Sequence, residues 1–245
     1  MKQFGLIGRN ISYSFSKGYF ADKFKNENIV GSTYDVFDLQ QIQDVEKVFE
    51  IEGLKGFNVT IPYKQEIMAY LDELSPEAAA IGAVNTVLIQ NGKKIGHNTD
   101  CFGFKTSLQP LLESHHTKAL VLGFGGAAKA VVYILEQLGI QYKVVSRTKK
   151  DDNLSYDELN QDILNEYSVI INCSPIGTFP NITDAPNIPY QFINEKHLLY
   201  DLIYNPEVTQ FLQNGLENGA KIKNGYEMLV QQAEKSWEIW NKALI

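Results

Sequence analysis

Short apolar runs along the chain alternate with segments in which apolar residues recur at the three- and four-residue spacing of a helix. In the second half, the unbroken apolar run at 119–122 is typical of a strand that is buried on both faces of a parallel sheet. Further strands of this pattern are expected at 142–145, 167–173 and 198–203, and a short last strand is expected at 220–223. Apolar residues recur at helical spacing over 130–138, and a further helix is expected at 209–216. The alternation predicts an α/β fold with parallel strands and right-handed crossovers.

The first hundred residues contain a second α/β pattern. Ser16 is the expected N-cap of its first helix, and Ser75-Pro76-Glu77 marks a later helix start. Asn91-Gly92 lies between two apolar segments and is typical of a two-residue hairpin turn. The expected strands are 4–7, 34–37, 56–61, 84–89 and 94–97, and the expected helices are 17–24, 45–49 and 67–71.

Two further helices suggest how the chain is divided. A helix at 104–112 links the two patterns, and a final helix at 227–244 carries apolar residues at helical spacing. Because the final helix follows the whole second pattern, we expect it to return to the first domain. The sequence therefore predicts two domains, residues 1–100 plus 227–245 and residues 101–226.

A glycine-rich turn lies between the first apolar run of the second half and the helix that follows it. Strand, glycine turn and helix is the arrangement that binds a dinucleotide. Gly123 permits the tight turn, and Gly125 lets backbone N–H groups approach a pyrophosphate. Ala128 is small enough for the helix to pack on the strand, and Gly126 and Ala127 complete the expected site. A structural turn is the alternative, and the surrounding strand and helix favour a nucleotide site.

The end of the next strand indicates which dinucleotide is bound. An acidic residue about twenty positions after the glycines would bind the ribose hydroxyls of NAD. Ser146, Arg147, Thr148 and Lys149 occupy this place instead. The guanidinium can pair with a 2′-phosphate, and the hydroxyls can donate hydrogen bonds to it. A solvated basic turn is the commoner fate of such a cluster, but its position favours NADP over NAD.

Composition and charge restrict the partners. The 245 residues are 44% hydrophobic and 21% charged, and their net charge is −7. The absence of a basic run argues against a nucleic-acid surface. No apolar run approaches the ~20 residues that span a bilayer, and no secretory signal is evident, so we expect no membrane partner.

The cysteines and histidines are not arranged as metal ligands. Cys101 and Cys173 are far apart, and we expect reduced thiols in a cytoplasmic protein. The four histidines are scattered and provide no set of ligands. No metal is therefore expected.

Small polar residues gather at the predicted strand ends of the first domain. They are Ser14, Ser16, Asn58, Thr60, Lys64 and Asn85, together with the turn at 96–100 that ends in Asp100. Each has an ordinary explanation as a turn residue, a helix cap or a surface lysine. Their joint occurrence at strand ends facing one cleft favours a site for a small hydroxylated ligand.

The chain resembles the shikimate dehydrogenase family over essentially its whole length. In that family the first domain binds the substrate, and the second is a Rossmann-type NADP-binding domain. The resemblance implies NADPH-dependent, reversible reduction of 3-dehydroshikimate to shikimate in chorismate and aromatic amino-acid biosynthesis. It is carried by Gly5-Leu6-Ile7-Gly8, Ser14-Phe15-Ser16, Asn58-Val59-Thr60-Ile61-Pro62-Tyr63-Lys64, Gly82-Ala83-Val84-Asn85-Thr86, Asn98-Thr99-Asp100, residues 123–128, Ser146-Arg147-Thr148, and residues 200–206 and 228–233.

The resemblance also implies roles for single residues. Lys64 and Asp100 match the catalytic pair, Tyr204 matches a tyrosine close to the substrate, and Gly225 matches a glycine near the nicotinamide. Hydride addition creates alkoxide character, which a lysine can stabilise and protonate while an aspartate holds the lysine in place. The substrate-binding positions match Ser14, Ser16, Asn58, Thr60, Asn85, Asp100 and Gln232. The expected partners are small molecules only, and the expected assembly is a monomer or a homodimer.

Three positions depart from the family pattern. Tyr13 replaces a histidine and Lys17 replaces a proline, both beside the expected carboxylate site, so we expect them to affect affinity more than reaction type. Ser146 replaces an asparagine but keeps a hydrogen-bond donor. One alternative is a quinate/shikimate dehydrogenase that uses NAD. Another is a catalytically idle ligand-binding relative, which the presence of both Lys64 and Asp100 argues against.

Overall fold

The computed structural model describes residues 1–11, 14–147 and 152–242, and the chain forms two compact units. The first unit comprises Met1–Thr99 and Ala233–Ile245, and the second comprises Asp100–Gln232. Within the described ranges, no helix combines the length and the apolar character needed to cross a bilayer.

The first unit is built on a mixed six-stranded sheet with the order β2-β1-β3-β5-β6-β4. β1 runs parallel to β2 and β3, whereas β5 runs antiparallel to β3 and β6. The β5–β6 turn has positive φ values at Asn91 (52°) and Gly92 (77°), which confirms the predicted hairpin. The strands are β1 (Lys2–Gly8), β2 (Ser32–Asp38), β3 (Gly56–Val59), β4 (Glu73–Leu74), β5 (Thr86–Gln90) and β6 (Lys93–His97).

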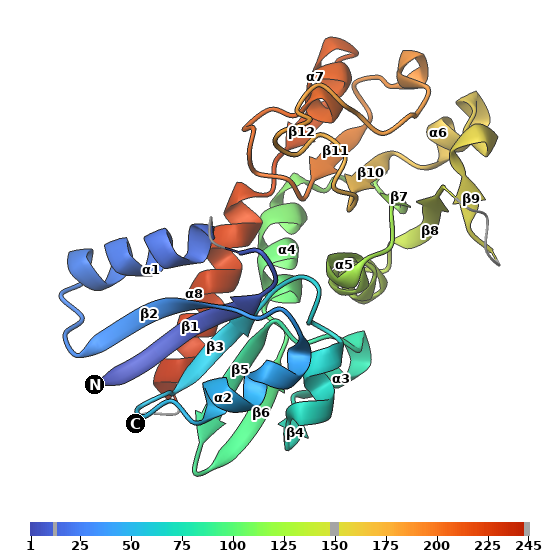
Figure 1. Cartoon of the computed structure of the whole chain (residues 1–245). Coiled ribbons are helices and arrows are strands. Elements are labelled where there is room, and N and C mark those ends of the chain that lie inside the picture. The colour runs from blue at the N-terminus through green and yellow to red at the C-terminus, as the bar shows by residue number, and fades with distance from the viewer. Residues whose placement is uncertain (12–13, 148–151, 243–245) are drawn as a thin grey trace. The chain divides into compact units, whose positions relative to one another are not determined.

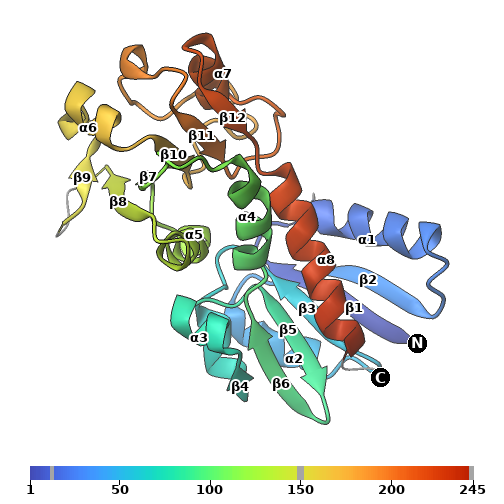
Figure 2. The ribbon, with the colours of Figure 1, turned by 180° about the vertical axis from the view of Figure 1, so that it is seen from behind.

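Two helices cover one face of this sheet, α1 (Phe15–Asn26) and the C-terminal part of α8 (Tyr226–Lys242), as Figures 1 and 2 show. Trp240 on α8 is fully buried and stacks on Phe4 with ring centroids 4.9 Å apart. Its indole N–H donates to the carbonyl of Val87 at 2.9 Å. A side chain at Gly56 would collide with this indole, so the glycine makes room for it. These contacts confirm that the last helix returns to the first domain.

The opposite face packs against α2 (Val45–Phe49), α3 (Pro76–Ile81) and two 3₁₀ helices. Ser75 caps α3 by accepting a hydrogen bond from the Ala78 N–H at 3.2 Å, as its hydroxyl predicted. The segment after Pro62 forms only a 3₁₀ helix. The 3₁₀ helices of this unit are η1 (Ile42–Asp44) and η2 (Glu66–Tyr70).

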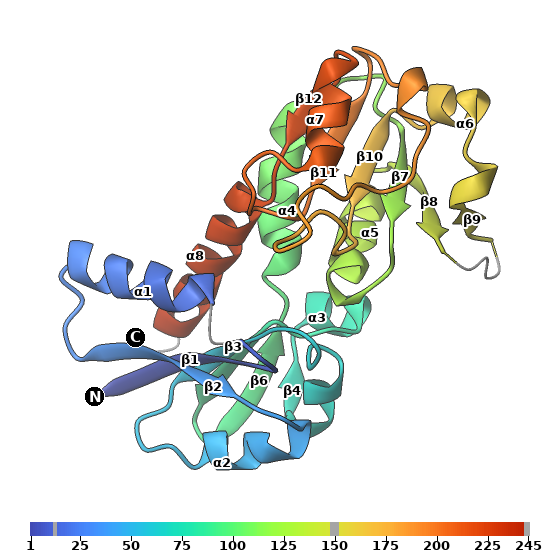
Figure 3. The same ribbon diagram turned by 45° about the horizontal axis from the view of Figure 1, so that its top comes forward.

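The second unit contains a fully parallel six-stranded sheet, visible in Figure 3, with the order β12-β11-β10-β7-β8-β9. Numbered by their order in this unit, the strands read 3-2-1-4-5-6 from β9, which is the Rossmann arrangement. The order reverses between β7 and β10, and the carboxyl ends of these two strands mark the ligand-binding crevice of such sheets. The strands are β7 (Lys118–Leu122), β8 (Gln141–Ser146), β9 (Leu154–Ser155), β10 (Val169–Asn172), β11 (Leu198–Asp201) and β12 (Lys221–Lys223).

Helices cover both faces of the second sheet. On one face α4 reaches β11, where the rings of Phe104 and Tyr200 meet with centroids 5.2 Å apart. On the other face, α6 and α7 supply buried residues such as Leu164 and Phe211 to a core that includes Leu120. The helices are α4 (Asp100–Leu108), α5 (Gly126–Gln137), α6 (Gln161–Glu166) and α7 (Gln210–Glu217), with 3₁₀ helices η3 (Gln109–Leu111), η4 (Tyr156–Glu158) and η5 (Tyr190–Phe192).

The predicted boundaries of β3 and α4 were wrong. β3 ends at Val59, before the expected end at Ile61. α4 begins at Asp100, earlier than predicted, and its α-helical part stops at Leu108. Pro110 lies in the 3₁₀ helix that follows, because proline restricts the residue before it and cannot donate within an α-helix.

Candidate functional site

Ser14 and Ser16 lie at the start of α1 in the first unit. Ser14 is the N-cap, and its hydroxyl accepts a hydrogen bond from the Ser16 N–H at 3.2 Å. The prediction that Ser16 caps this helix is therefore wrong, because α1 begins at Phe15. Ser16 is buried, and its side chain interacts with the phenol of Tyr34.

Asn58 lies near the end of β3 and is buried, with 5% of its surface exposed. Its Oδ1 accepts a hydrogen bond from the Tyr34 hydroxyl at 2.8 Å. Its Nδ2 contacts the Asn85 carbonyl at 3.2 Å, Thr86 Oγ1 at 3.1 Å and Ser236 Oγ at 2.9 Å. The carboxamide is thus held by groups from β2, β5 and α8.

Asn85 precedes β5 and is linked to the turn that follows β6. Its Oδ1 accepts the Thr99 N–H at 2.6 Å, and its Nδ2 donates to Thr99 Oγ1 at 3.0 Å. Asn98 donates through Nδ2 to the Ala83 carbonyl at 2.9 Å and ties the same two turns together. Both turns are therefore fixed by side-chain amides, which gives the asparagines of the two motifs a shared structural role.

Lys64 lies in the segment that follows β3, and its side chain is half-buried. The carbonyl of Lys64 accepts the Val84 N–H at 2.7 Å, next to Asn85. The Thr60 N–H donates to the Ile7 carbonyl at 2.9 Å. These bonds bring Thr60 and Lys64 to the same edge of the first sheet as Asn58 and Asn85.

Asp100 and Gln232 are buried members of the second unit, on α4 and α8. Gly103 lies one turn after Asp100, on the same face of α4. A Cβ at Gly103 would collide with the Met228 carbonyl and lie 3.1 Å from the Gln232 backbone nitrogen. The absence of a side chain at Gly103 therefore allows the helix carrying Gln232 to pack against the face of α4 that begins with Asp100.

The glycine turn after β7 has the geometry that a dinucleotide pyrophosphate needs. Gly123 has a φ of 86°, and a Cβ there would lie 3.2 Å from the Cβ of Ser174, which follows β10. Gly125 is the N-cap of α5 and provides no side-chain cap, and open space surrounds the position of its absent Cβ. Ala128 is fully buried, as close packing of helix and strand requires. The N–H groups at the start of α5, including those of Gly126 and Ala127, can therefore bind an anion.

We expect Gly123→Ala to lower the free energy of unfolding by about 1–2 kcal/mol, because a residue with a Cβ is strained at positive φ. Gly125→Ala is the matched control, since its φ of −101° suits any residue and its Cβ would meet open space. Urea unfolding of both variants measures the difference. Equal stability of the two would contradict the strain at Gly123.

Ser146 and Arg147 lie at the end of β8, where the ribose end of a dinucleotide is expected. Ser146 is the last residue of the strand and pairs with Ser155 of β9. Arg147 is exposed. Burial raises the pKa of Tyr156, and the Arg147 guanidinium lowers it, which places the cation beside η4. The predicted cofactor residues Thr148 and Lys149 lie outside the described residues.

Tyr204 and Gly225 belong to neighbouring loops of the second unit. The Gly225 N–H donates to the Ile203 carbonyl at 3.0 Å, and a Cβ at Gly225 would collide with the Leu202 carbonyl. Tyr204 has 38% of its surface exposed, and burial of the remainder raises the pKa of its phenol.

A buried carboxylate supports this loop region. Asp201, at the end of β11, accepts hydrogen bonds from Thr209 Oγ1 at 2.6 Å, Asn172 Nδ2 at 3.1 Å and the Ile203 N–H at 3.0 Å. Burial raises the pKa of Asp201 to about 6, and these three donors partly offset it. Asn172 also accepts from the Ser174 N–H at 3.0 Å. Asp201 and Asn172 thereby fix the loops at the carboxyl ends of β10 and β11, where the ligand crevice of a Rossmann sheet lies.

Sequence reasoning missed Tyr34 and Ser236 as supports of the candidate site. A signal for Ser236 was present, because it lies three residues after the buried Ala233 and is a polar residue on an otherwise apolar face of α8. Tyr34 lay within an expected strand and carried no such signal.

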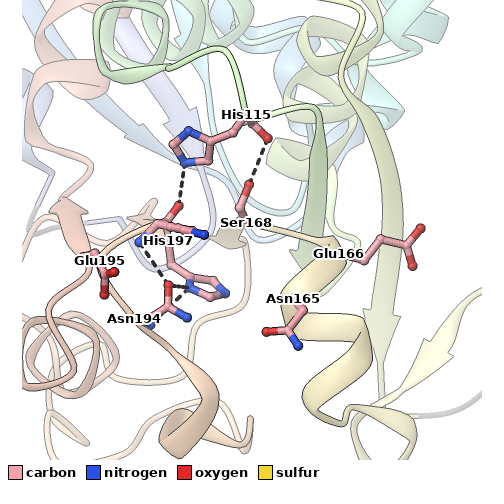
Figure 4. Close-up of a pocket in the computed structure, with 8 residues that line it drawn as sticks. His115, Asn165, Glu166, Ser168, Asn194, Glu195 and His197 are labelled. Carbon is pink, nitrogen blue, oxygen red and sulfur yellow. Dashed lines mark hydrogen bonds between the residues drawn. The ribbon is translucent and has the colours of Figure 1, made fainter.

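A shallow pocket of about 410 Å³ occurs elsewhere on the second unit, and Figure 4 shows its lining. It lies beside Ser168 and His197, which directly precede β10 and β11, and beside His115, which lies shortly before β7. His115 Nε2 donates to the Lys196 carbonyl at 3.0 Å, and Ser168 Oγ to the His115 carbonyl at 3.4 Å. The pocket is at the amino ends of the strands, whereas α/β sheets bind ligands at the carboxyl ends, so we exclude it from the candidate site.

Metal ligands were not expected from the sequence. Across the described part of the chain, no group of three or more histidine, cysteine, aspartate or glutamate side chains could hold a metal ion. Cys101 and Cys173 are free thiols.

Comparison with known proteins identifies the family. Residues 6–87 match the model of the shikimate dehydrogenase substrate binding domain. The chain is 40% identical to the shikimate dehydrogenase (NADP(+)) of Clostridium botulinum, over 96% of this chain and 95% of the relative. The crystal structure of shikimate dehydrogenase 1 from Peptoclostridium difficile superposes with a TM-score of 0.83 and 37% identity, covering 99% of this chain and 92% of that one. The crystal structure of shikimate 5-dehydrogenase from Thermus thermophilus in complex with NADP(H) and shikimate superposes with a TM-score of 0.87 and 28% identity. The match covers 99% of this chain and 94% of that one. The chain belongs to the shikimate dehydrogenase family.

Proposed function

We propose that this chain catalyses the NADPH-dependent, reversible reduction of 3-dehydroshikimate to shikimate. The observation that carries the proposal is the gathering of Asn58, Asn85 and Lys64 at one edge of the first sheet, in a chain whose second unit holds a glycine turn at a Rossmann crevice. The relatives named for this reaction span nearly the whole chain and support it.

NADPH, when bound, supplies the hydride that reduces the substrate ketone. The glycine turn and the start of α5 suit its pyrophosphate, because Gly125 leaves open space and α5 has no side-chain cap. The 2′-phosphate is assigned to Arg147 and Ser146, together with Thr148 and Lys149. We assign Gly225 a place near the nicotinamide.

Lys64 is proposed to act at the ketone oxygen. Its ammonium group stabilises the negative charge that develops on this oxygen and then donates a proton to it. Asp100 is its proposed partner, which orients the lysine and accepts hydrogen bonds from substrate hydroxyls. In the reverse direction Lys64 accepts the hydroxyl proton.

The remaining contacts orient the substrate. Ser14 and Ser16 can donate their hydroxyl protons to a carboxylate. Tyr204 is proposed to lie close to the substrate. The hydroxyl groups of the substrate are assigned to Thr60, Asn58, Asn85 and Gln232.

A kinetic matrix of two cofactors and two polyols tests the function. We expect NADP with shikimate to give the highest kcat/KM, measured by the absorbance of NADPH formed. Higher kcat/KM with NAD and quinate would favour the quinate/shikimate dehydrogenase alternative. Purified, folded protein without turnover on either polyol would refute the proposal and favour an idle ligand-binding relative. The assembly, monomer or homodimer, stays a prediction for sedimentation analysis.

A further inference from the structure

A buried hydrogen-bond network in the first unit extends beyond the residues assigned to the substrate. It joins Ser16, Asn58 and Asn85 through side chains that have no assigned function. Two of these are Tyr34 on β2, with 6% of its surface exposed, and Ser236 on α8, which is fully buried.

Tyr34 connects two proposed substrate ligands. Its phenol interacts with the Ser16 side chain, and its hydroxyl proton goes to Asn58 Oδ1 at 2.8 Å. Burial raises the pKa of Tyr34 above its usual range, so the phenol stays protonated and remains a donor. A single tyrosine thereby links the start of α1 to the end of β3.

Ser236 connects Asn58 to Asn85. Its Oγ lies 2.9 Å from Asn58 Nδ2, 2.8 Å from Thr86 Oγ1 and 3.1 Å from Thr99 Oγ1. Thr99 in turn holds both ends of the Asn85 carboxamide, through its N–H and its hydroxyl. The C-terminal helix therefore contributes one hydroxyl to the connection between the two asparagines.

The network determines which end of the Asn58 carboxamide is left for a ligand. Nδ2 faces the Asn85 carbonyl, which can only accept, so the orientation of the amide is defined. Both amide protons are used by the carbonyl and by the hydroxyls of Thr86 and Ser236. Tyr34 occupies one lone pair of Oδ1. Asn58 can thus offer a ligand one acceptor and no donor, which suits a hydroxyl group and not a carboxylate.

We propose that Tyr34 and Ser236 are positioning residues that fix Asn58 and Asn85 for binding of the substrate hydroxyls. This inference rests on the proposed function, because it assumes that both asparagines contact shikimate. Neither Tyr34 nor Ser236 is assigned a contact with the ligand. Their effect on binding comes from holding the carboxamides in one orientation before the ligand arrives.

Shikimate binding by calorimetry tests the proposal on the full chain. We expect Tyr34→Phe and Ser236→Ala each to raise the Kd of shikimate about tenfold, which corresponds to about 1.4 kcal/mol. Tyr200→Phe and Ser107→Ala are the matched controls, because they break a comparable buried tyrosine–serine hydrogen bond of 2.6 Å in the second unit. The controls should leave the Kd of shikimate within twofold.

Ser236→Cys covers the case in which Ser236→Ala does not fold. It keeps the shape of the side chain with a somewhat larger terminal atom and replaces the hydroxyl with a weak hydrogen-bonding group. We expect it to bind shikimate as weakly as Ser236→Ala. Folded Tyr34→Phe and Ser236→Cys proteins that bind as tightly as the unaltered chain would overturn the proposal. Equal weakening by the controls would also overturn it, because the effect would then come from stability alone.

A measurement without ligand separates this inference from the proposed function. In nitrogen-15 spectra of the free protein, the side-chain NH₂ of Asn58 is assigned by its loss in Asn58→Asp. We expect its exchange with water to be slow in the unaltered chain and at least about tenfold faster in Tyr34→Phe and Ser236→Ala, because buried, bonded amides exchange only on opening. Unchanged exchange would refute the positioning role. Failure of the unaltered chain to bind shikimate would refute the proposed function instead.

Discussion

Replacing Lys64 with alanine is expected to lower kcat by about 10²–10⁴-fold, which is the usual cost of losing a positioned acid or base. The change in KM for shikimate should be modest, because the lysine acts mainly on the charge that develops during the reaction. Steady-state kinetics with shikimate and NADP measures both parameters.

The physical reason lies in the two tasks that a single ammonium group performs. Transfer of hydride to a ketone leaves negative charge on oxygen, and a cation at that oxygen lowers the barrier. The same group then supplies the proton. Lys64→Arg separates the tasks, because arginine stays charged but does not give up its proton. We expect this variant to lose activity as well, since only the electrostatic part is preserved.

Lys94→Ala is the matched control for Lys64. Lys94 belongs to the same unit, and its ammonium lies 4.9 Å from the ring centroid of Phe49 and 4.0 Å from Asp72. It is not assigned to the site, so kcat should be unchanged. A near-normal kcat in folded Lys64→Ala protein would contradict the catalytic assignment.

Arg147→Ala is expected to raise the KM for NADP about 10–100-fold and to change the KM for NAD little. Hydrogen bonds to charged groups contribute roughly 1.5–3 kcal/mol, which corresponds to about this range. NAD has no 2′-phosphate, so it loses only a contact with the ribose or the adenine. The measurement compares kcat/KM for the two cofactors at saturating shikimate.

Lys196→Ala controls for the loss of a positive charge from the second unit. Lys196 is exposed and lines the pocket at the amino ends of the strands, away from the glycine turn. It should leave both KM values unchanged. If Arg147→Ala raised the KM for NADP and NAD equally, the assignment of the phosphate to Arg147 would be wrong.

Much of the fold was predictable because its signals are local. The Asn91-Gly92 hairpin, the Ser75 cap and the glycine turn at 123–125 each depend on residues within a few positions of one another, and all three were confirmed. The segment 119–122 of β7 is a continuous apolar run because both faces of this strand are buried.

The helix boundaries show where local signals fail. Ser14 and Ser16 both carry capping hydroxyls, and only the backbone path decided that Ser14 caps α1. Asp100 was interpreted as part of a turn, but it begins α4, where a carboxylate is favourable near the positive end of the helix dipole. Gly103 made a helix there harder to predict, and the close approach of α8 explains why a glycine occupies that position.

The sequence by itself determined the two α/β patterns, the glycine turn and the residues that resemble a family site, since each depends on spacing along the chain. Only the tertiary structure decided how the amides of that site are held. Asn58 and Ser236 are 178 positions apart, yet their side chains are in hydrogen-bond contact. The spacing of residues along the chain does not specify such a pair. The serine reaches the asparagine because the apolar face of α8 is buried on the first sheet. The glycine turn therefore follows from local chemistry, whereas the orientation of Asn58 follows from packing between distant segments.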